Sequence, residues 1–324
     1  MPPVLDSLIG NLMVPTILFF VLGLIAAVVR SDLSIPAGAA KFMSLYLLLA
    51  IGFKGGHSLA DHGLRSDLFV AIGAGLALSF LIPFIAFLLL RVMTRLDPMN
   101  AAAVAGHYGS ISIVTFVAAS SLLELTGLSY DGYMVAVAAS MEVPAILSAL
   151  WIAHKYGRDA SSSGSVPMRE LFANGSIVLL TGAFFIGAVT QDKGMEMIAP
   201  FVVTPFTGIL CLFLLDMGLS AGRSLLRNRH MLTIGLFSFG LLMPVIGALL
   251  ALGLGSVIGL QTGSLFLLMV LSASASYIAV PAAMRIALPQ AEAGIYLTLS
   301  LGVTFPFNIT VGLPLYLWLA GLAS

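Results

Sequence analysis

Two stretches of the sequence place small polar residues inside largely apolar surroundings. The first reads AVAGHYGSISIVTFVAASS (residues 103–121) and the second reads VLSASASYIAVPAAMRIALP (residues 270–289). Glycine weakens a helix, and Pro281 cannot donate a backbone hydrogen bond to the preceding turn. We therefore predict that both stretches are membrane helices interrupted near their middle. Interrupted backbone at membrane depth is tolerated where it lines a cavity or is buried in protein, so a binding site is expected here.

An interrupted helix offers chemistry that suits a small anion. The N-terminus of each half-helix has free N–H groups and about half a positive charge, and serine hydroxyls donate to the same anion. Freed carbonyls with serine and threonine oxygens coordinate a hard cation such as Na⁺. The alternative is that the small residues permit close helix packing and the serines bond back to nearby carbonyls. The predicted substrate-binding residues are Gly109, Ser110, Ser112, Ser272, Ser274 and Ser276.

A carboxylate inside a membrane helix is costly and marks a functional site by default. Glu142 lies in the segment AASMEVPAIL, within an expected span. It can bind a cation, carry a proton, or pair with His107 or Lys41; the alternative is a structural ion pair or a helix-end carboxylate. The place equivalent to Glu142 in the second half of the chain is Thr304, and Asn308 follows one turn later. Both are uncharged oxygen donors, so an asymmetric cation site is expected. The predicted sodium ligands are Thr115, Glu142, Thr304 and Asn308.

Other reactive side chains point to no catalysis. Asp216, the second acid in an apolar segment, is expected to pair with a basic residue, with assistance of cation coupling as the alternative. His107 is expected to be a hydrogen-bonded packing residue, with a ligand role as the alternative. The sequence contains no HExxH, GxSxG or P-loop motif, so neither zinc proteolysis nor nucleotide-driven pumping is suggested. We expect no enzymatic activity and no cofactor, with Na⁺ as a coupling ion only.

The composition places these residues in a membrane. Of the 324 residues, 60% are apolar and 9% are charged, with 14 basic and 14 acidic side chains. An average soluble domain has about a quarter of its residues charged, so a soluble enzyme is excluded. The net charge of zero gives no attraction to nucleic acid. The single cysteine, Cys211, rules out a disulfide framework and a cysteine-based metal site.

Apolar runs of about 20 residues predict membrane spans. We expect ten, at residues 12–29, 36–59, 68–90, 99–123, 131–153, 172–190, 197–222, 231–256, 262–287 and 292–320. The predicted organisation is a first repeat at 1–155, a polar cytoplasmic linker at 156–171 and a second repeat at 172–324. Only three of the 14 basic residues (Lys54, Arg65 and Lys193) then lie on the side of the N-terminus. The excess of positive charge on the other side predicts that both termini are outside the cell.

Four features recur in the same order in both halves, at offsets of 161 to 166 residues. They are IGFKGGHSL (51–59) with MGLSAGRSL (217–225), Pro83 with Pro244, Ser110–Ser112 with Ser272–Ser274, and Pro144 with Pro306. Each half has five spans, and an odd number reverses the second copy in the membrane. The predicted fold is an all-α integral membrane protein with ten transmembrane helices in two inverted five-helix repeats, the fourth and ninth helices being broken. Inverted repeats are typical of secondary transporters that bind substrate at the repeat interface, although a channel is also compatible with them.

The segments AGHYGSISIVTF, SMEVPAILSAL, SASASYIAVPAAMRIALP and VTFPFNITVGLPLYLWLAG resemble the SbtA-type sodium-dependent bicarbonate transporter family along essentially the whole chain. The resemblance implies a bacterial inner-membrane permease, usually a homotrimer, that imports bicarbonate with Na⁺ by moving a core domain against a gate domain. Some members are regulated by a PII-like trimer on the cytoplasmic face. Four departures fall near the implied ligands: Ile113-Val114 replaces a Gly-Ser pair, Tyr277 replaces an aspartate, Ala279-Val280 replaces a Ser-Gly pair, and Glu142 replaces the aspartate of an MDIP segment.

The sequence therefore predicts a Na⁺-coupled importer of a small anion, with bicarbonate as the first candidate. Three alternatives stay open at this point: a Na⁺-coupled carrier of another small organic anion, a passive anion channel, and a membrane sensor or scaffold without transport. The expected partners are bicarbonate, Na⁺ and the lipid bilayer, and no nucleic acid.

Overall fold

The computed structural model describes residues 14–62, 66–156, 175–277 and 279–323. Within these ranges the chain is helical and has no β-strand. The predicted linker at 156–171 lies, apart from Tyr156, outside the described residues. The elements are α2 (Pro15–Val28), α3 (Ala37–His62), α4 (Ser66–Met93), α5 (Pro98–Gly109), α6 (Ile113–Thr126), α7 (Met134–Ser140), α8 (Glu142–Tyr156), α10 (Gly175–Val202), α11 (Phe206–Asn228), η2 (Arg229–Met231), α12 (Ile234–Val257), α13 (Thr262–Ala273), α14 (Ala279–Ala287), α15 (Ala293–Leu297), η3 (Thr298–Thr304), α16 (Phe305–Phe307), η4 (Asn308–Gly312) and α17 (Leu313–Ala323).

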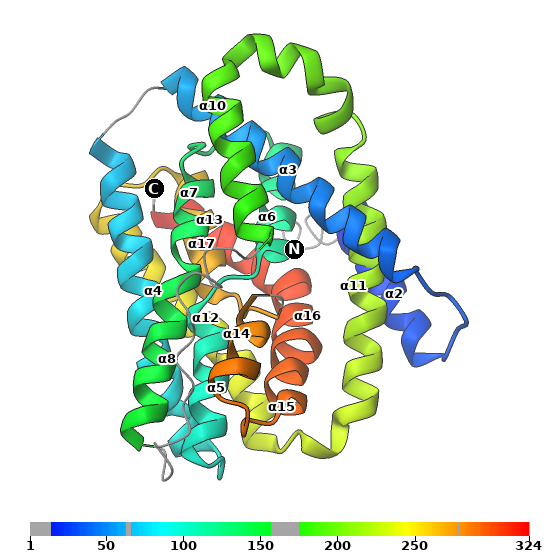
Figure 1. Ribbon diagram of the computed structural model, residues 1–324, viewed down its shortest axis with the longest axis vertical. Helices are drawn as coiled ribbons and strands as arrows, with labels where there is room; N and C mark the ends of the chain where they lie inside the picture. Colours follow the sequence, from blue (N-terminus) through cyan, green and yellow to red (C-terminus); the bar gives the residue numbers. More distant parts are fainter. Residues whose placement is uncertain (1–13, 63–65, 157–174, 278, 324) are drawn as a thin grey trace.

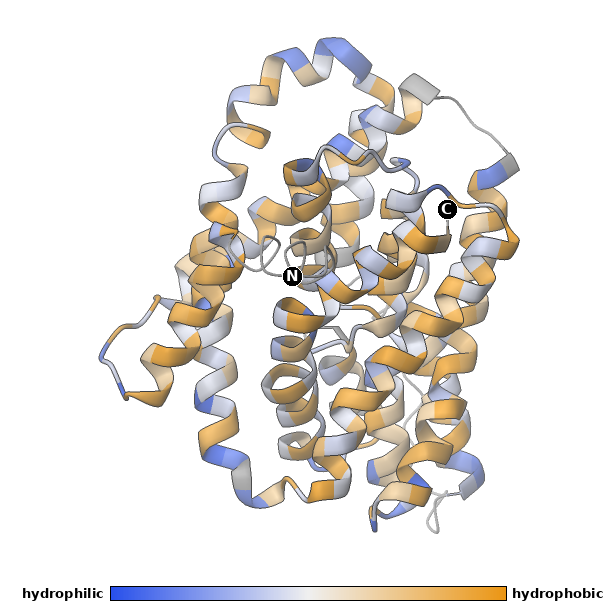
Figure 2. Ribbon diagram, turned by 180° about the vertical axis from the view of Figure 1, so that it is seen from behind, coloured by the Kyte–Doolittle hydropathy of each residue, from blue (hydrophilic) through white to orange (hydrophobic). Residues whose placement is uncertain are grey.

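The helices have the length and hydropathy of a multi-pass membrane protein. Seven segments of the described chain are long and apolar enough to cross a membrane: Ala37–Ala60, Asp67–Met93, Pro98–Thr126, Met134–Tyr156, Phe206–Asn228, Ile234–Val257 and Ala293–Ala323. Helices α2 and α13 are apolar but shorter. Hydrophobic residues dominate the helices between their ends, and hydrophilic residues gather near the ends (Figure 2). The all-α membrane class predicted from the sequence is therefore confirmed, while the count of ten spans stays a prediction.

One predicted boundary is wrong. The seventh span was expected to begin at residue 197, but α11 begins at Phe206. The sixth span was expected to end at residue 190, and this end is confirmed, because α10 consists of two helical segments that meet at a kink where the backbone of Gln191 is non-helical (φ 50°, ψ −143°). The second segment ends at Val202, shortly before Pro205, and proline disfavours helical backbone in the residue that precedes it.

The helices form two groups (Figure 1). We call α2, α3, α10 and α11 the four-helix layer, because α3 packs mainly against α10 and α2 mainly against α11. We call the remaining helices the central bundle, in which α4, α5 and α8 pack together and α13 packs against α12 and α17. Helix α11 also contacts η3, so the layer and the bundle touch along this helix.

Glycines let the helices of the layer approach each other closely. A Cβ added at Gly56 of α3 would lie 1.8 Å from the carbonyl oxygen of Phe184 in α10, and one at Gly218 of α11 would lie 2.1 Å from that of Phe20 in α2. Small residues are the usual means by which membrane helices pack backbone to backbone. Gly56 and Gly218 belong to the two segments that the sequence analysis matched, so both matched segments lie at close helix crossings.

Replacing Gly56 by alanine is expected to destabilise the protein by about 3 kcal/mol or more, because the added methyl group would overlap rigid backbone. Gly182 of α10 is the matched control, since nothing lies within 4 Å of its added Cβ. There, alanine is expected to be neutral or stabilising by up to about 1 kcal/mol through its higher helix propensity. Thermal unfolding of both variants in detergent checks this. A Gly56→Ala protein as stable as Gly182→Ala would contradict the close packing of α3 and α10.

Candidate anion and sodium site at the crossing of two interrupted helices

The first interruption separates α5 from α6. Asp97 caps α5 by accepting from the backbone N–H groups of Met99 and Asn100, and α5 ends at Gly109. Ser110 then has extended backbone (φ −88°, ψ 170°). Ser112 is the N-cap of α6, where its hydroxyl oxygen accepts from the backbone N–H of Thr115 at 3.3 Å. The interruption predicted from the glycines and serines of this segment is confirmed.

The second interruption has the same form. Helices α5 and α13 are both 12 residues long and begin 164 positions apart, at Pro98 and Thr262. Ser274 has nearly the same backbone angles (φ −86°, ψ 162°) as Ser110. The hydroxyl of Ser276 accepts from the backbone N–H of Val280, at 3.4 Å, at the start of α14.

This likeness corrects one detail of the sequence analysis. Ser110 corresponds to Ser274, and Ser112 to Ser276, whereas the sequence match had paired Ser110–Ser112 with Ser272–Ser274. Three serines at alternate positions allow two registers, and only the position of the helix break selects one. Ser272 is therefore a residue of the last turn of α13 and corresponds to Tyr108 in α5.

The two interruptions touch each other. The backbone N–H of Ser112 donates to the hydroxyl oxygen of Ser274 at 2.8 Å, and the backbone N–H of Ser276 donates to the carbonyl oxygen of His107 at 2.8 Å. In Figure 1, α5 and α14 occupy the lower half of the molecule and α6 and α13 the upper half. The four half-helices therefore meet midway along the molecule, and the starts of α6 and α14 lie at this crossing.

Several buried polar atoms at the crossing have no hydrogen-bond partner among the residues that the structure describes. They are the hydroxyl oxygens of Thr115, Ser272 and Tyr277 and the Nε2 atom of His107, and Thr115, Ser272 and His107 are at most 3% exposed. A buried polar group without a partner costs about 1–3 kcal/mol. Such atoms are consequently candidates for contact with a bound ion or water.

His107 is held firmly in place. Its Nδ1 atom lies 2.7 Å from the carbonyl oxygen of Ala103, and its ring stacks on that of Tyr296 with centroids 4.3 Å apart. Because a carbonyl only accepts, Nδ1 carries the hydrogen, and in the neutral ring Nε2 carries a lone pair. The expected packing role is therefore confirmed, but one ring atom is left to accept a hydrogen bond.

Glu142 is linked directly to the first interruption. The hydroxyl of Ser110 donates to its Oε2 atom at 2.8 Å, and the side chain is 8% exposed. The sequence analysis missed that the helix breaks at Met141, immediately before Glu142. Pro144, in the first turn of α8, fits such a break, and the hydroxyl of Ser79 donates to the freed carbonyl of Met141 at 2.5 Å.

The sequence of the chain matches a known protein family over nearly its whole length. The sequence profile of the Na⁺-dependent bicarbonate transporter superfamily matches residues 15–321. The chain belongs to this family. No curated protein matches the chain. Membership implies Na⁺-dependent bicarbonate transport across a membrane, and it implies that the protein is a transporter and not an enzyme.

The remaining predicted sodium ligands lie in distorted helix. Thr304 ends the π-helix η3, and Asn308 begins the π-helix η4. The hydroxyl of Thr304 donates to the carbonyl oxygen of Gly240 at 2.7 Å, so the hydroxyl of Tyr108 must donate to Thr304, at 2.6 Å. π-helical turns are frequent at functional sites, and the sequence analysis did not foresee them.

Asn308 uses its amide to join helices of the central bundle. Its Nδ2 atom donates to the carbonyl oxygen of Ala273 at 2.9 Å, and its Oδ1 atom accepts from the hydroxyl of Tyr316 at 3.0 Å. Among the described residues, no hydrogen bond joins Thr304 or Asn308 to Glu142. In the structure, Glu142 and Thr115 therefore lie at the first interruption. Thr304 and Asn308 instead form hydrogen bonds with the helices around the crossing.

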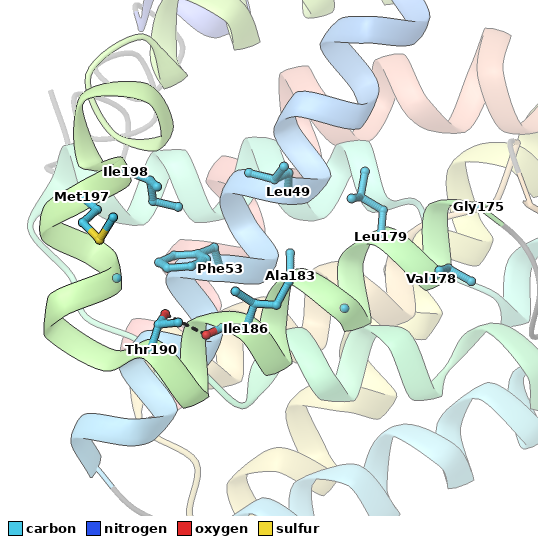
Figure 3. A pocket seen from close by; sticks show the side chains of 12 residues that line it. Leu49, Phe53, Gly175, Val178, Leu179, Ala183, Ile186, Thr190, Met197 and Ile198 are labelled. Atoms are coloured by element: carbon cyan, nitrogen blue, oxygen red, sulfur yellow. Dashed lines mark hydrogen bonds between the residues drawn. The ribbon is translucent and has the colours of Figure 1, made fainter.

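A large groove between α3 and α10 is chemically unsuited to bicarbonate. It has a volume of about 540 Å³, and its walls include Leu49, Phe53 and Ile186 (Figure 3). The hydroxyl of Thr190, its one side chain with a polar group, donates to the carbonyl oxygen of Ile186 at 2.8 Å. A small anion in this groove would lose hydration without gaining hydrogen bonds. Asp216, the second predicted intramembrane acid, is partly buried on α11, a helix of the four-helix layer.

Proposed function

We propose that the protein imports bicarbonate together with Na⁺ as a secondary transporter, by alternating access of the central bundle against the four-helix layer. The observation that carries the proposal is the crossing of the two interrupted helices, where buried hydroxyls of Thr115 and Ser272 have no partner. A site of this kind at the middle of a membrane protein is the usual place of a transported ion. Family membership supplies the expected substrates.

The anion would be held by backbone and hydroxyl groups. At the start of α6, the N–H groups of Ile113 and Val114 have no acceptor within the helix, and the helix contributes roughly half a positive charge there. The Ser272 hydroxyl is a further donor, and Nε2 of His107 is an acceptor that matches the hydroxyl of bicarbonate. These groups suit a small, singly charged, planar anion that both donates and accepts hydrogen bonds.

The sodium ion would lie beside Glu142. One carboxylate oxygen of Glu142 accepts from Ser110, and no cationic side chain among those described forms an ion pair with it. An uncompensated carboxylate would repel an anion bound at the neighbouring serines. A Na⁺ ion between them would remove the repulsion, which gives a physical reason for the two ions to bind together.

Other parts of the proposal rest on the arrangement of the helices. The equal lengths of α5 and α13, and the packing of α2 on α11 and of α3 on α10, support two inverted five-helix repeats. A homotrimer, a PII-like regulator and both termini outside a bacterial inner membrane stay predictions.

Reconstituted uptake tests the function. Vesicles that contain the purified protein should accumulate labelled bicarbonate when Na⁺ is higher outside, and accumulation should saturate with bicarbonate. Replacing the Na⁺ gradient by an equal K⁺ gradient should reduce uptake to the level of protein-free vesicles. Non-saturating flux without Na⁺ dependence would favour a passive channel. Stronger competition by a small carboxylate than by unlabelled bicarbonate would favour another organic anion as substrate.

A further inference from the structure

A groove of about 600 Å³ lies between α4 and α8, at the end of the molecule where both helices finish and α5 begins. This size is within the range of ligand-binding pockets. Its walls are mainly aromatic and aliphatic side chains, joined by one arginine. The lining residues are Phe84, Phe87, Leu88, Arg91, Pro98, Trp151, Ile152 and Tyr156.

Contacts between rings on the two helices fix the walls. Phe84 of α4 meets Trp151 of α8 with ring centroids 5.5 Å apart, and Phe87 stacks on Tyr156 at 5.3 Å. Trp151 is nevertheless 49% exposed and Leu88 66% exposed. The groove is therefore preformed and opens sideways from the helices, toward the lipid of a surrounding membrane.

Two cationic side chains lie at one end of this groove. Arg91, in the last turn of α4, donates from one nitrogen to the carbonyl oxygen of Leu96 at 2.6 Å, which leaves most of its five N–H donors for another partner. The ammonium of Lys155 lies 4.6 Å from the ring centre of Trp151 and 5.5 Å from that of Tyr156. Both side chains are exposed.

The acid nearest to Arg91 along the chain does not neutralise it. Asp97 accepts from the backbone N–H groups of Met99 and Asn100, and from the side-chain amide of Asn100 at 2.6 Å. Its carboxylate is committed to the start of α5. The groove thus combines an apolar, aromatic interior with two cations at one rim, neither of which forms an ion pair with an acidic side chain in the described part of the chain.

We infer that this groove is a specific binding site for an anionic phospholipid. The phosphate would bind Arg91 and Lys155, and one acyl chain would lie along Phe84, Leu88 and Ile152. Arginine suits phosphate through its forked N–H donors, and basic pockets between membrane helices are known sites for anionic headgroups. A soluble phosphate would leave the apolar walls exposed to water, whereas a neutral phospholipid would leave the two cations without a partner.

The two tryptophans of the chain allow a direct test. Trp151 lines the groove, and Trp318 on α17 is 38% exposed but is not among its lining residues. The protein is reconstituted in vesicles that contain low amounts of phosphatidylglycerol or phosphatidylcholine with brominated acyl chains, which quench tryptophan fluorescence on contact. In Trp318→Phe protein, brominated phosphatidylglycerol should quench Trp151 at roughly tenfold lower mole fraction than brominated phosphatidylcholine. In Trp151→Phe protein, the two lipids should quench Trp318 equally.

Matched variants assign the preference to the two cations. The double substitution Arg91→Ala and Lys155→Ala in Trp318→Phe protein should remove the preference for phosphatidylglycerol. Arg227→Ala should retain it, because Arg227 also lies in the last turn of its helix, α11, but outside the groove. Equal quenching of Trp151 by both lipids in the parent protein would overturn the inference, as would an undiminished preference in the double variant. Should the double variant misfold, Lys155→Ala alone must still weaken the preference.

Discussion

Replacing Glu142 by glutamine is expected to abolish Na⁺-dependent bicarbonate uptake while leaving the protein folded. Glutamine has nearly the same shape, and its amide oxygen can still accept the hydrogen bond that Ser110 donates at 2.8 Å. What is lost is the negative charge of a side chain that is only 8% exposed. A Na⁺ ion bound beside it would lose its one charged ligand among the predicted sodium ligands.

The expected effect is large, because removing one partner of a buried ion pair costs about 3–5 kcal/mol. Uptake at limiting Na⁺ should therefore fall by at least about a hundredfold, since each factor of ten corresponds to about 1.4 kcal/mol. Glu196→Gln is the matched control, as Glu196 is an exposed carboxylate on α10, and it should transport like the parent. The measurement is labelled-bicarbonate uptake against external Na⁺, with thermal unfolding to show that both variants are folded. Parental Na⁺ dependence in Glu142→Gln would remove Glu142 from the sodium site.

Much of this architecture was predictable because its signals are local. Runs of apolar residues determine where a chain can cross a membrane. The residues that weaken a helix lie at the interruptions themselves, as Gly109 does immediately before Ser110. The buried Glu142 was also identifiable from sequence, because a carboxylate in an apolar segment is rare. Its contact with Ser110 was not, since the two residues belong to helices that only the folded bundle brings together.

Features set by contacts between distant helices could not be read from the sequence. The choice between two registers for the serines depends on where α13 ends, at Ala273, and the alternating serines are equally spaced in both registers. The π-helical turns around Thr304 and Asn308 have bonds to Gly240 and Ala273, which lie far away in the sequence. The kink that joins the two helical segments of α10 depends on the positive φ of Gln191, a backbone conformation that the residue type does not favour. For the serines, Thr304 and Asn308, the sequence predicted the polar residues, and tertiary contacts determined what they bind.

A covalent cross-link between positions 54 and 124, now occupied by Lys54 and Glu124, is expected to stop transport completely and reversibly. The ammonium of Lys54, on α3, lies 2.5 Å from Oε1 of Glu124, near the end of α6, and 4.7 Å from the ring centre of Phe206. The pair thus joins the four-helix layer to the central bundle. At 21% and 42% exposure of the two side chains, it is an exposed ion pair of the kind worth about 1 kcal/mol or less, so it can open during each cycle. A covalent link cannot open, and alternating access requires the four-helix layer and the central bundle to move against each other.

The experiment starts from a Cys211→Ala protein, because Cys211 is the chain's single cysteine. Lys54→Cys and Glu124→Cys are introduced together. They are bridged by a bifunctional thiol-reactive reagent that forms a reducible disulfide-containing bridge, since two long side chains in contact leave their backbones too far apart for a direct disulfide. Uptake should fall to the level of protein-free vesicles and return when the bridge is reduced. The control is the pair His57 and Asp192, which lie 2.9 Å apart on α3 and α10, both within the layer; bridging them should leave uptake intact. Because a passive channel needs no such movement, full uptake after complete bridging of positions 54 and 124 would refute alternating access between these helix groups, even if Na⁺-dependent uptake itself were established.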